Sequence, residues 1–168
     1  MAESVRRGII PTLDPVNFDL VKEAELRRRM ITAKYQQTGH MIFSHYPREA
    51  VLVNLDRSLV GQIIYDLLDN ACKYSPVRSG VRLKVSASGR RAWVSVSDCG
   101  PGLPPNVERS LYQMGIRGQG TKTQGLGLGL FRVRRHVDWL EGRIDYLSSA
   151  EGGTEFTVEL PRGEWSQK

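Results

Sequence analysis

The sequence predicts an α/β (α+β) two-layer sandwich, in which helices cover one face of a mixed sheet. Helical patterns alternate along the chain with strand-like segments, and this alternation favours a single sheet with helices on one side. The chain has 168 residues, enough for one domain with a substantial core. Its 40% hydrophobic and 25% charged residues are typical of globular domains.

Elements of the first half alternate between extended and helical patterns. An extended piece at residues 16–20 precedes a helical pattern that we expect to stop at Gly39. Residues 41–43 and 51–53 are predicted to form short buried strands, separated by Pro47. A strong helix is predicted from about Ser58 to Tyr74, since Pro76 disfavours its continuation.

The second half predicts two hairpins and one helix. Alternating residues 81–86 and the run 93–97 read as strands, with Arg90 and Arg91 in the turn. Residues 100–129 are weakly structured, with a short helix expected only near 107–112, and such long stretches are usually functional or mobile. An apolar face from Leu130 to Leu140 predicts a helix, and strands are expected at 142–148 and 154–160.

Bulk properties exclude several classes of protein. Mean hydropathy is −0.35, and no apolar run approaches the roughly 18–20 residues that span a bilayer. The polar, basic start is not a signal peptide. Cys72 and Cys99 lack metal-ligand spacing, so we expect free thiols in a reducing cytosol. A cytoplasmic domain without membrane contact is expected, although the full-length protein could be anchored in the inner membrane.

The chain is basic, with a net charge of +6 and a pI of about 9.6. This charge suits an anionic partner such as a nucleotide, a nucleic acid or an acidic protein surface. The basic residues form small clusters without interleaved aromatic residues, so we expect solvated faces and no nucleic-acid site.

A row of polar residues follows one side of the helix predicted at 58–74. Gln62, Asp66, Asn70 and Lys73 lie at i, i+4, i+8 and i+11, opposite the apolar face. A solvent-exposed face is one explanation. However, Asn is unfavourable inside helices, and a carboxylate, an amide and an ammonium in one row suit a metal–nucleotide complex.

Two glycine-rich segments could approach a ligand. Asp98 to Gly102 follow a strand directly, and the Asp98 carboxylate could accept a hydrogen bond from an adenine amino group, although a tight turn explains the pattern too. Gly125, Gly127 and Gly129 open a helix, and exposed amides at a helix N-terminus favour phosphate. This segment is neither a Walker A loop nor a Rossmann fingerprint.

Together these segments resemble the catalytic domain of sensor histidine kinases, from the ATPase superfamily that includes DNA gyrase, mismatch-repair ATPases and heat-shock chaperones. Residues 66–76 are similar to the N box, 98–102 to the G1 box, 125–130 to the G2 box, and 153–161 to the closing strand. The resemblance implies a Bergerat fold, with a mixed sheet of about five strands, three helices on one face and a flexible ATP lid.

The resemblance also implies roles for individual residues. Asn70 would ligate Mg²⁺, Asp98 would hold the adenine amino group, and Lys73 would reach the phosphates. Tyr74 would lie against the adenine or ribose, unless it is buried in the core. Thr154 would support the adenine pocket. The full predicted nucleotide site is Asn70, Lys73, Tyr74, Asp98, Gly100, Gly102, Arg117, Lys122, Gln124, Gly125, Leu126, Gly127, Leu128, Gly129 and Thr154.

Three departures from the family pattern stand out. Asp66 occupies a position that often carries Asn in histidine kinases and Glu in the hydrolysing relatives, so it could contact the metal through water or act as a base. Asp66, Asn70 and Lys73 are therefore the candidate catalytic residues. The aromatic F box is not evident, although Leu111 and Tyr112 could replace it, and residues 139–142 replace the usual small-residue helix ending.

The phosphoryl acceptor is not evident in this chain. His40, His45 and His136 lack the sequence context of a phosphorylated histidine. The resemblance therefore implies two partners, which are a histidine-containing dimerisation domain of the same kinase and a downstream response regulator. It also implies that the isolated domain is a monomer and that the full kinase is a homodimer. We expect residues 15–162 to form the catalytic domain, 1–14 to be the tail of a preceding segment or a remnant, and 163–168 to be a C-terminal tail.

Three other functions stay open at this stage. A stand-alone serine kinase of the anti-sigma type would use the same fold. An ATP hydrolase of the gyrase or mismatch-repair type would use Asp66 as the base. A non-catalytic nucleotide sensor or nucleic-acid binder would lack catalysis altogether.

Overall fold

The computed structural model describes residues 11–103, 128–149 and 151–164. Its described helices are α1 (Leu20–Lys34), the short 3₁₀ helix η1 (Gln36–Thr38), α2 (Arg57–Tyr74) and α4 (Gly129–Trp139). Its described strands are β1 (Pro15–Asp19), β2 (Met41–His45), β3 (Leu52–Asp56), β4 (Gly80–Ser88), β5 (Arg91–Ser97), β6 (Arg143–Ser149) and β7 (Gly153–Pro161).

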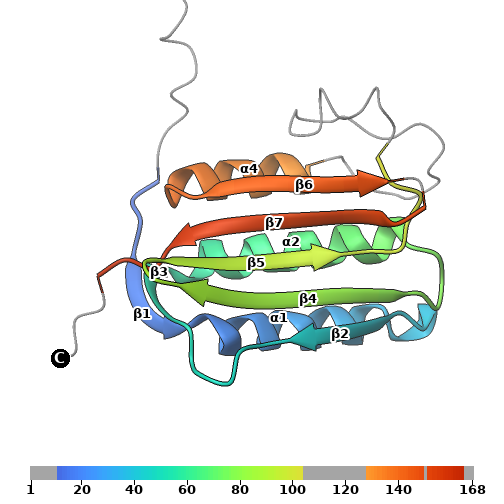
Figure 1. The fold of residues 1–168 in the computed structure, drawn as a ribbon, viewed down its shortest axis with the longest axis horizontal. Coiled ribbons are helices and arrows are strands. Elements are labelled where there is room, and N and C mark those ends of the chain that lie inside the picture. The colour runs from blue at the N-terminus through green and yellow to red at the C-terminus, as the bar shows by residue number, and fades with distance from the viewer. Residues whose placement is uncertain (1–10, 104–127, 150, 165–168) are drawn as a thin grey trace, which may run out of the picture.

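The main sheet has five strands in the order β2-β4-β5-β7-β6. β2 runs parallel to β4, and the other neighbours are antiparallel. α1, α2 and α4 all lie behind this sheet in Figure 1, so the predicted mixed sheet with helices on one face is confirmed. β1 and β3 form a separate two-stranded antiparallel sheet, which the sequence did not predict.

The helix starts are fixed by aspartate caps. Asp56 precedes α2, and its carboxylate accepts hydrogen bonds from the backbone amides of Ser58 and Leu59 at 3.1 and 3.2 Å. Asp19 caps α1 through the amide of Val21, and it also accepts from the amide of Val51 at 3.2 Å. Such caps satisfy amides that have no partner within the helix. The second bond made by Asp19 also ties the start of α1 to the segment before β3.

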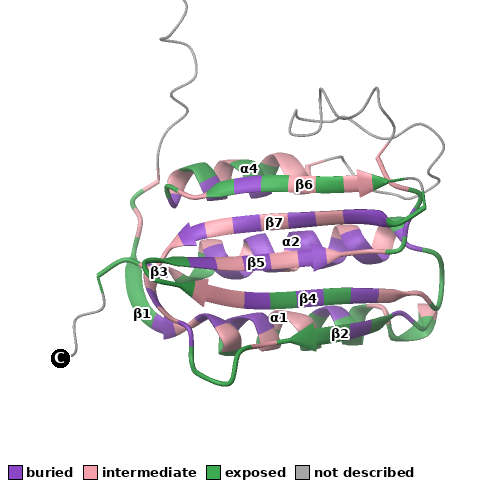
Figure 2. Cartoon of the chain, in the orientation of Figure 1, coloured by how far each residue is buried: buried purple, intermediate pink, exposed green. Residues whose placement is uncertain are grey.

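The core lies between the helices and the inner face of the sheet. Along β5, buried Val94 and Val96 alternate with half-buried Ser95 and Ser97, and β4 and β7 show the same period of two (Figure 2). This alternation is expected when one face of a sheet is packed and the other faces solvent. The opposite face of the main sheet is therefore polar and open.

The strand predicted at residues 41–43 is confirmed as part of β2, but the prediction that it is buried is wrong. β2 is an edge strand, and only Ile42 in it is buried, whereas Met41 and Phe43 are each 55% exposed. Three consecutive apolar residues suggested burial on both faces, but an edge strand buries one face only. The second predicted strand, now β3, belongs to the smaller sheet.

Two boundaries differ from expectation, and two predictions cannot be placed. Arg91 was expected in a turn but begins β5. The helix expected near residues 107–112 and the flexible ATP lid lie outside the described residues. None of the described helices is long and apolar enough to cross a membrane.

A buried charge network joins α1 to α2. Glu23 is fully buried and accepts hydrogen bonds from Arg27 and Arg57, each at 2.7 Å. Arg27 lies one turn further along α1, whereas Arg57 is the first residue of α2. A buried carboxylate requires such partners because an unpaired charge in the interior is strongly unfavourable.

Replacement of Glu23 by Gln should destabilise the fold. The neutral amide cannot satisfy two guanidinium groups, so we expect the free energy of unfolding to fall by about 2–3 kcal/mol. Urea denaturation followed by circular dichroism measures this change. Glu49→Gln is the matched control, because Glu49 is exposed, and it should shift stability by less than about 0.5 kcal/mol. Equal effects of the two substitutions on the free energy of unfolding would contradict a stabilising role of the Glu23 charge network.

Candidate functional site

Asp98 lies directly after β5, where the sheet meets the C-terminal end of α2. Its backbone amide donates to the carbonyl of Thr154 at 2.9 Å. Its Oδ1 accepts from the amides of Gly100 at 2.8 Å and Thr154 at 3.3 Å. Oδ2 has no hydrogen-bond partner in the described part of the chain. Burial raises the pKa of Asp98, and the two amide hydrogen bonds act in the opposite direction. One carboxylate oxygen is thus held in place and the other is available to a donor.

Glycine is required at two positions beside Asp98. A β-carbon at Gly100 would lie 2.8 Å from the carbonyl oxygen of Tyr74, so a side chain would push the segment away from α2. Gly153 has φ of +77°, and its β-carbon would overlap the carbonyl oxygen of Asp98. Both glycines bring the ends of β5, β7 and α2 together. The predicted contact of Gly100 and Gly102 with a nucleotide base stays a prediction.

Thr154 closes the other side of the Asp98 carboxylate. It is buried, and its Oγ1 lies 3.1 Å from Oγ of Ser148, which in turn accepts from the amide of Leu103 at 2.7 Å. A cavity of about 720 Å³ opens beside these residues and is lined by Asp98, Thr154 and Ser148 among others. Cavities that take small ligands have volumes of about 300–1,000 Å³.

The two cysteines differ sharply in environment. Cys99 lines the same cavity, is exposed, and places its sulfur 3.4 Å from the carbonyl oxygen of Gly80. Cys72 is buried on α2, and burial raises the pKa of its thiol to about 12. Both thiols are free, as predicted.

The polar row of α2 faces α4. Asp66 is only 4% exposed, and both of its oxygens are engaged by Arg132 of α4. The Nε–Oδ2 distance is 2.7 Å and the Nη2–Oδ1 distance is 2.6 Å, while Gln62 donates to Oδ1 at 2.9 Å. The explanation of this row as a solvent face is therefore wrong for Asp66.

Asn70 lies on α2, one turn after Asp66, and its side chain is next to the start of α4. Its Oδ1 is 3.3 Å from the position that a β-carbon would take at Gly129, the first residue of α4. The Asn70 side chain has no hydrogen-bond partner in the described ranges. Leu128, which precedes α4, gives no side-chain cap. An unpaired amide thus adjoins a helix N-terminus, where backbone N–H groups and the helix dipole favour anions.

Lys73 is held by Asp69, one turn before it on the same helix. Lys34 also donates to the Asp69 carboxylate at 2.7 Å and Tyr35 donates at 2.8 Å. Burial alone would raise the pKa of Asp69, but the hydrogen bonds from Lys34, Lys73 and Tyr35 together lower it. Lys73 therefore contacts a carboxylate in this structure, and its contact with phosphate stays a prediction.

Tyr74 is 40% exposed at the end of α2, so the alternative of burial in the core is wrong. Several predicted site residues cannot be placed. They lie outside the described residues and are Arg117, Lys122, Gln124, Gly125, Leu126 and Gly127.

Four residues of this region were not predicted from the sequence as site residues: Asp69, Arg132, Ser148 and Gly153. Asp69 precedes Lys73 by four positions, a spacing that could have signalled the ion pair. Gly153 was assigned to the closing strand, without a role in the site. Arg132 was counted among solvated surface charges, because nothing in a linear pattern shows which helix lies opposite. Ser148 carried no signal in the sequence.

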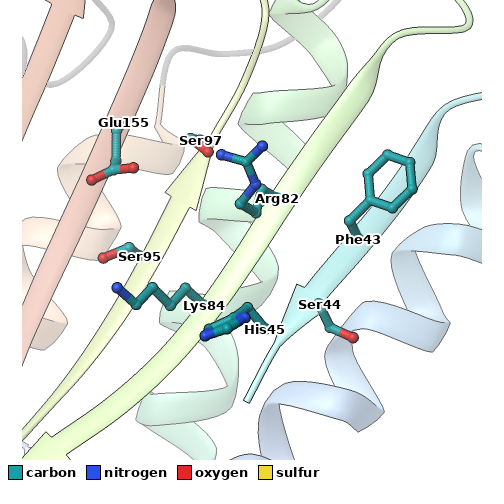
Figure 3. A pocket seen from close by; sticks show the side chains of 8 residues that line it. All are labelled: Phe43, Ser44, His45, Arg82, Lys84, Ser95, Ser97 and Glu155. Atoms are coloured by element: carbon teal, nitrogen blue, oxygen red, sulfur yellow. The ribbon is translucent and has the colours of Figure 1, made fainter. Parts of the chain in front are cut away.

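A second hollow lies on the open face of the main sheet, with a volume of about 430 Å³. Its lining includes Phe43, Arg82, Lys84 and Glu155, which Figure 3 shows on the strands rather than the helices. It contains none of the predicted site residues. The predicted residues that the structure places lie instead at the ends of β5 and β7, which include Asp98 and Thr154, and on α2 and the start of α4.

Comparison with known proteins gives a consistent family. Residues 55–164 match the family model described as histidine kinase-, DNA gyrase B- and HSP90-like ATPase. The sensor protein KdpD of Clostridium acetobutylicum is 28% identical over 158 residues, which are 89% of this chain and 17% of that protein. The sensor histidine kinase TmoS of Ectopseudomonas mendocina is 31% identical over 169 residues, covering 96% of this chain and 16% of that protein. This chain thus spans less than a fifth of the length of either relative.

Solved structures of histidine kinases have the same fold. The catalytic domain of the histidine kinase ThkA has a TM-score of 0.78 at 21% identity, covering 89% of this chain and 96% of that one. Full-length ShkA in complex with AMPPNP has a TM-score of 0.77 at 25% identity, covering 92% of this chain and 32% of that one. The chain therefore belongs to the family of histidine kinase-, DNA gyrase B- and HSP90-like ATPases, and the relatives it resembles are sensor kinases.

Proposed function

We propose that this chain is the ATP-binding catalytic domain of a two-component sensor histidine kinase. It binds Mg-ATP and transfers the γ-phosphoryl group to a histidine on a separate dimerisation domain. The observation that supports this proposal best is that two predicted ligand-binding side chains have polar atoms without hydrogen-bond partners among the described residues. Asp98, whose Oδ2 is unpaired, lines the larger cavity, and the unpaired Asn70 amide lies beside the N-terminus of α4.

Adenine is the base that fits Asp98. Its exocyclic amino group is a hydrogen-bond donor, whereas guanine presents a carbonyl oxygen at the same position and would oppose a carboxylate. Oδ1 is already held by the amides of Gly100 and Thr154, so the carboxylate is oriented before the base binds. A preoriented acceptor loses little conformational freedom on binding.

Asn70 fits a magnesium ion that is shared with phosphates. An amide oxygen is a hard ligand, and Mg²⁺ usually takes only one or two protein ligands besides phosphate oxygens and water. When bound, the ion would neutralise charge on the phosphates and so assist transfer. The N-terminus of α4, which begins at Gly129, would bind the phosphates through its backbone amides.

Lys73 would supply a further positive charge. If its ammonium group moved from Asp69 to a phosphate, Lys34 and Tyr35 would still donate to Asp69. The buried carboxylate would therefore keep the two donors to Oδ1 and lose only the contact of Lys73 with Oδ2. This arrangement supports the predicted catalytic role of Lys73.

The acceptor histidine would come from elsewhere in the kinase. Nδ1 of His40 lies 2.7 Å from Thr38 Oγ1, and His136 lies on α4 with a pKa that burial lowers. His45 lies on the edge strand β2 and lines the second hollow together with Lys84 (Figure 3). The partners would be the dimerisation domain of the same kinase and a response regulator. We place the domain in the cytoplasm, as a monomer in isolation and within a homodimer in the full kinase.

Asp98→Asn should weaken Mg-ATP binding by about 10- to 100-fold, because a charge-assisted hydrogen bond contributes about 1.5–3 kcal/mol. Isothermal titration calorimetry measures the affinity. Asp145→Asn is the matched control: Asp145 lies on β6, is 62% exposed and pairs with Arg143, so its loss should leave the affinity unchanged. Equal Mg-ATP affinity of the Asp98 variant and the wild type would refute the proposed hydrogen bond between adenine and Asp98.

Asn70→Ala should abolish phosphoryl transfer while the fold persists, since Asn70 is half-buried and makes no hydrogen bond among the described residues. The measurement mixes the chain and Mg-[γ-³²P]ATP with the separately produced dimerisation domain and follows its labelling. Asn17→Ala is the control, because Asn17 is exposed on β1. Acid-labile label identifies phosphohistidine, whereas acid-stable label on a partner serine would favour the serine-kinase alternative. Labelling unaffected by Asn70→Ala would overturn the site.

A further inference from the structure

The pair formed by Asp66 and Arg132 is the main charged contact between α2 and α4. Asp66 is buried, whereas the Arg132 side chain is 45% exposed. Both carboxylate oxygens accept from the guanidinium, and Gln62 adds a third hydrogen bond. Bidentate arginine–carboxylate pairs are geometrically specific, so this contact fixes distance and orientation together.

The pair lies beside the proposed magnesium and phosphate groups. Asp66 precedes Asn70 by one turn of α2, and Arg132 lies in the first turn of α4, with its amide donating to the carbonyl of Leu128 at 2.9 Å. Asn70 itself reaches Gly129 at the start of α4. In the described part of the chain, the Asp66–Arg132 pair is the ionic contact between these two helices, so it helps to set the spacing between the proposed metal ligand and the proposed phosphate-binding helix start.

Other charges near Asp66 do not replace Arg132. His136 lies one turn further along α4, but burial lowers its pKa and favours its neutral form. Gln62 is neutral. Arg134 points its guanidinium at Asp138 at 3.0 Å on the same helix. Arg132 is therefore the cation that compensates the buried Asp66 carboxylate.

From this geometry we propose that Arg132 is a positioning residue of the proposed ATP site. Through Asp66 it fixes the first turn of α4 against α2, and it keeps the Asp66 carboxylate from accepting a proton from water. The inference rests on the proposed function. It concerns whether the bound ATP is used for transfer to a protein acceptor or is hydrolysed. An engaged carboxylate favours transfer to a protein acceptor over hydrolysis.

The suppressed reaction is hydrolysis of ATP. A water oxygen would form a bond to the γ-phosphorus as the bond from that phosphorus to the β–γ bridging oxygen breaks, and the water proton would pass to Asp66. ADP and inorganic phosphate are the products, and the proton is later released to solvent. Arg132 engages both oxygens of Asp66, Gln62 donates to Oδ1 as well, and the residue is only 4% exposed, so these contacts and burial oppose proton transfer from a water to Asp66.

Arg132→Gln is the informative substitution. It should lower Mg-ATP affinity about 10- to 100-fold, as loss of a residue that supports a metal site commonly does. It should also raise phosphate release by the isolated 168-residue chain at saturating Mg-ATP by about tenfold or more, within the range of a general base. A merely structural role would not create a new activity. Arg132→Lys keeps the positive charge but cannot make the two-point guanidinium contact. Relative to Arg132→Gln, it should return hydrolysis to the low wild-type rate while recovering only part of the Mg-ATP affinity.

The double variant Asp66→Asn/Arg132→Gln tests the mechanism. It should lose the gained hydrolysis and bind Mg-ATP more tightly than Arg132→Gln alone, because no uncompensated carboxylate remains. Arg134→Gln, on the same helix, is the matched control and should resemble the wild type. Thermal denaturation of all variants checks that each one is folded.

Two outcomes would overturn the inference: hydrolysis by Arg132→Gln that stays at the wild-type rate, or a gain that persists in the double variant. A wild-type chain that binds no Mg-ATP would instead refute the proposed function. The two failures are therefore distinguishable by the wild-type titration alone.

Discussion

The packing of α2 against the inner face of the sheet is the constraint on which the rest of the structure depends. Ile64, Leu67 and Leu68 are almost fully buried, so the helix can neither rotate nor slide without opening the core. Asp66 and Asn70 lie on the same rigid helix, and their positions therefore follow from core packing. The proposed site residues therefore lie on this helix and at the ends of β5 and β7, where packing holds them in place.

Charge pairs join the helices across the layer behind the sheet. Glu23 of α1 pairs with Arg57 of α2, and Asp69 of α2 pairs with Lys34 of α1. Asp66 of α2 pairs with Arg132 of α4. In each case a buried carboxylate accepts from a basic side chain whose own surface is partly exposed. The helix layer is therefore specified by directional contacts as well as by apolar packing, and these contacts leave few alternative registers.

The sequence predicted the fold well, because the periodicity of α2 and the alternation along β4 and β5 report directly on burial. It also singled out Asp98 and Thr154, which line one cavity, and Asn70, which lies at the start of α4, and their roles stay predictions. It failed where the outcome depends on a distant partner. Asp66 looked available until Arg132, 66 positions away, was seen to engage it. The exposed edge of β2 was missed for the same reason, since strand order is a property of the whole chain.

The contrast between the two cysteines has a practical consequence. Cys99 is exposed beside Asp98, so a thiol reagent can reach it in the native state, and a ligand in the adjoining cavity would shield it. Cys72 lies on α2 with its side chain buried, and burial raises the pKa of its thiol to about 12. It should therefore react only when α2 separates from the sheet. The natural chain thus carries two built-in chemical reporters. One reads occupancy of the cavity and the other reads opening of the core, and no engineered label is needed for either.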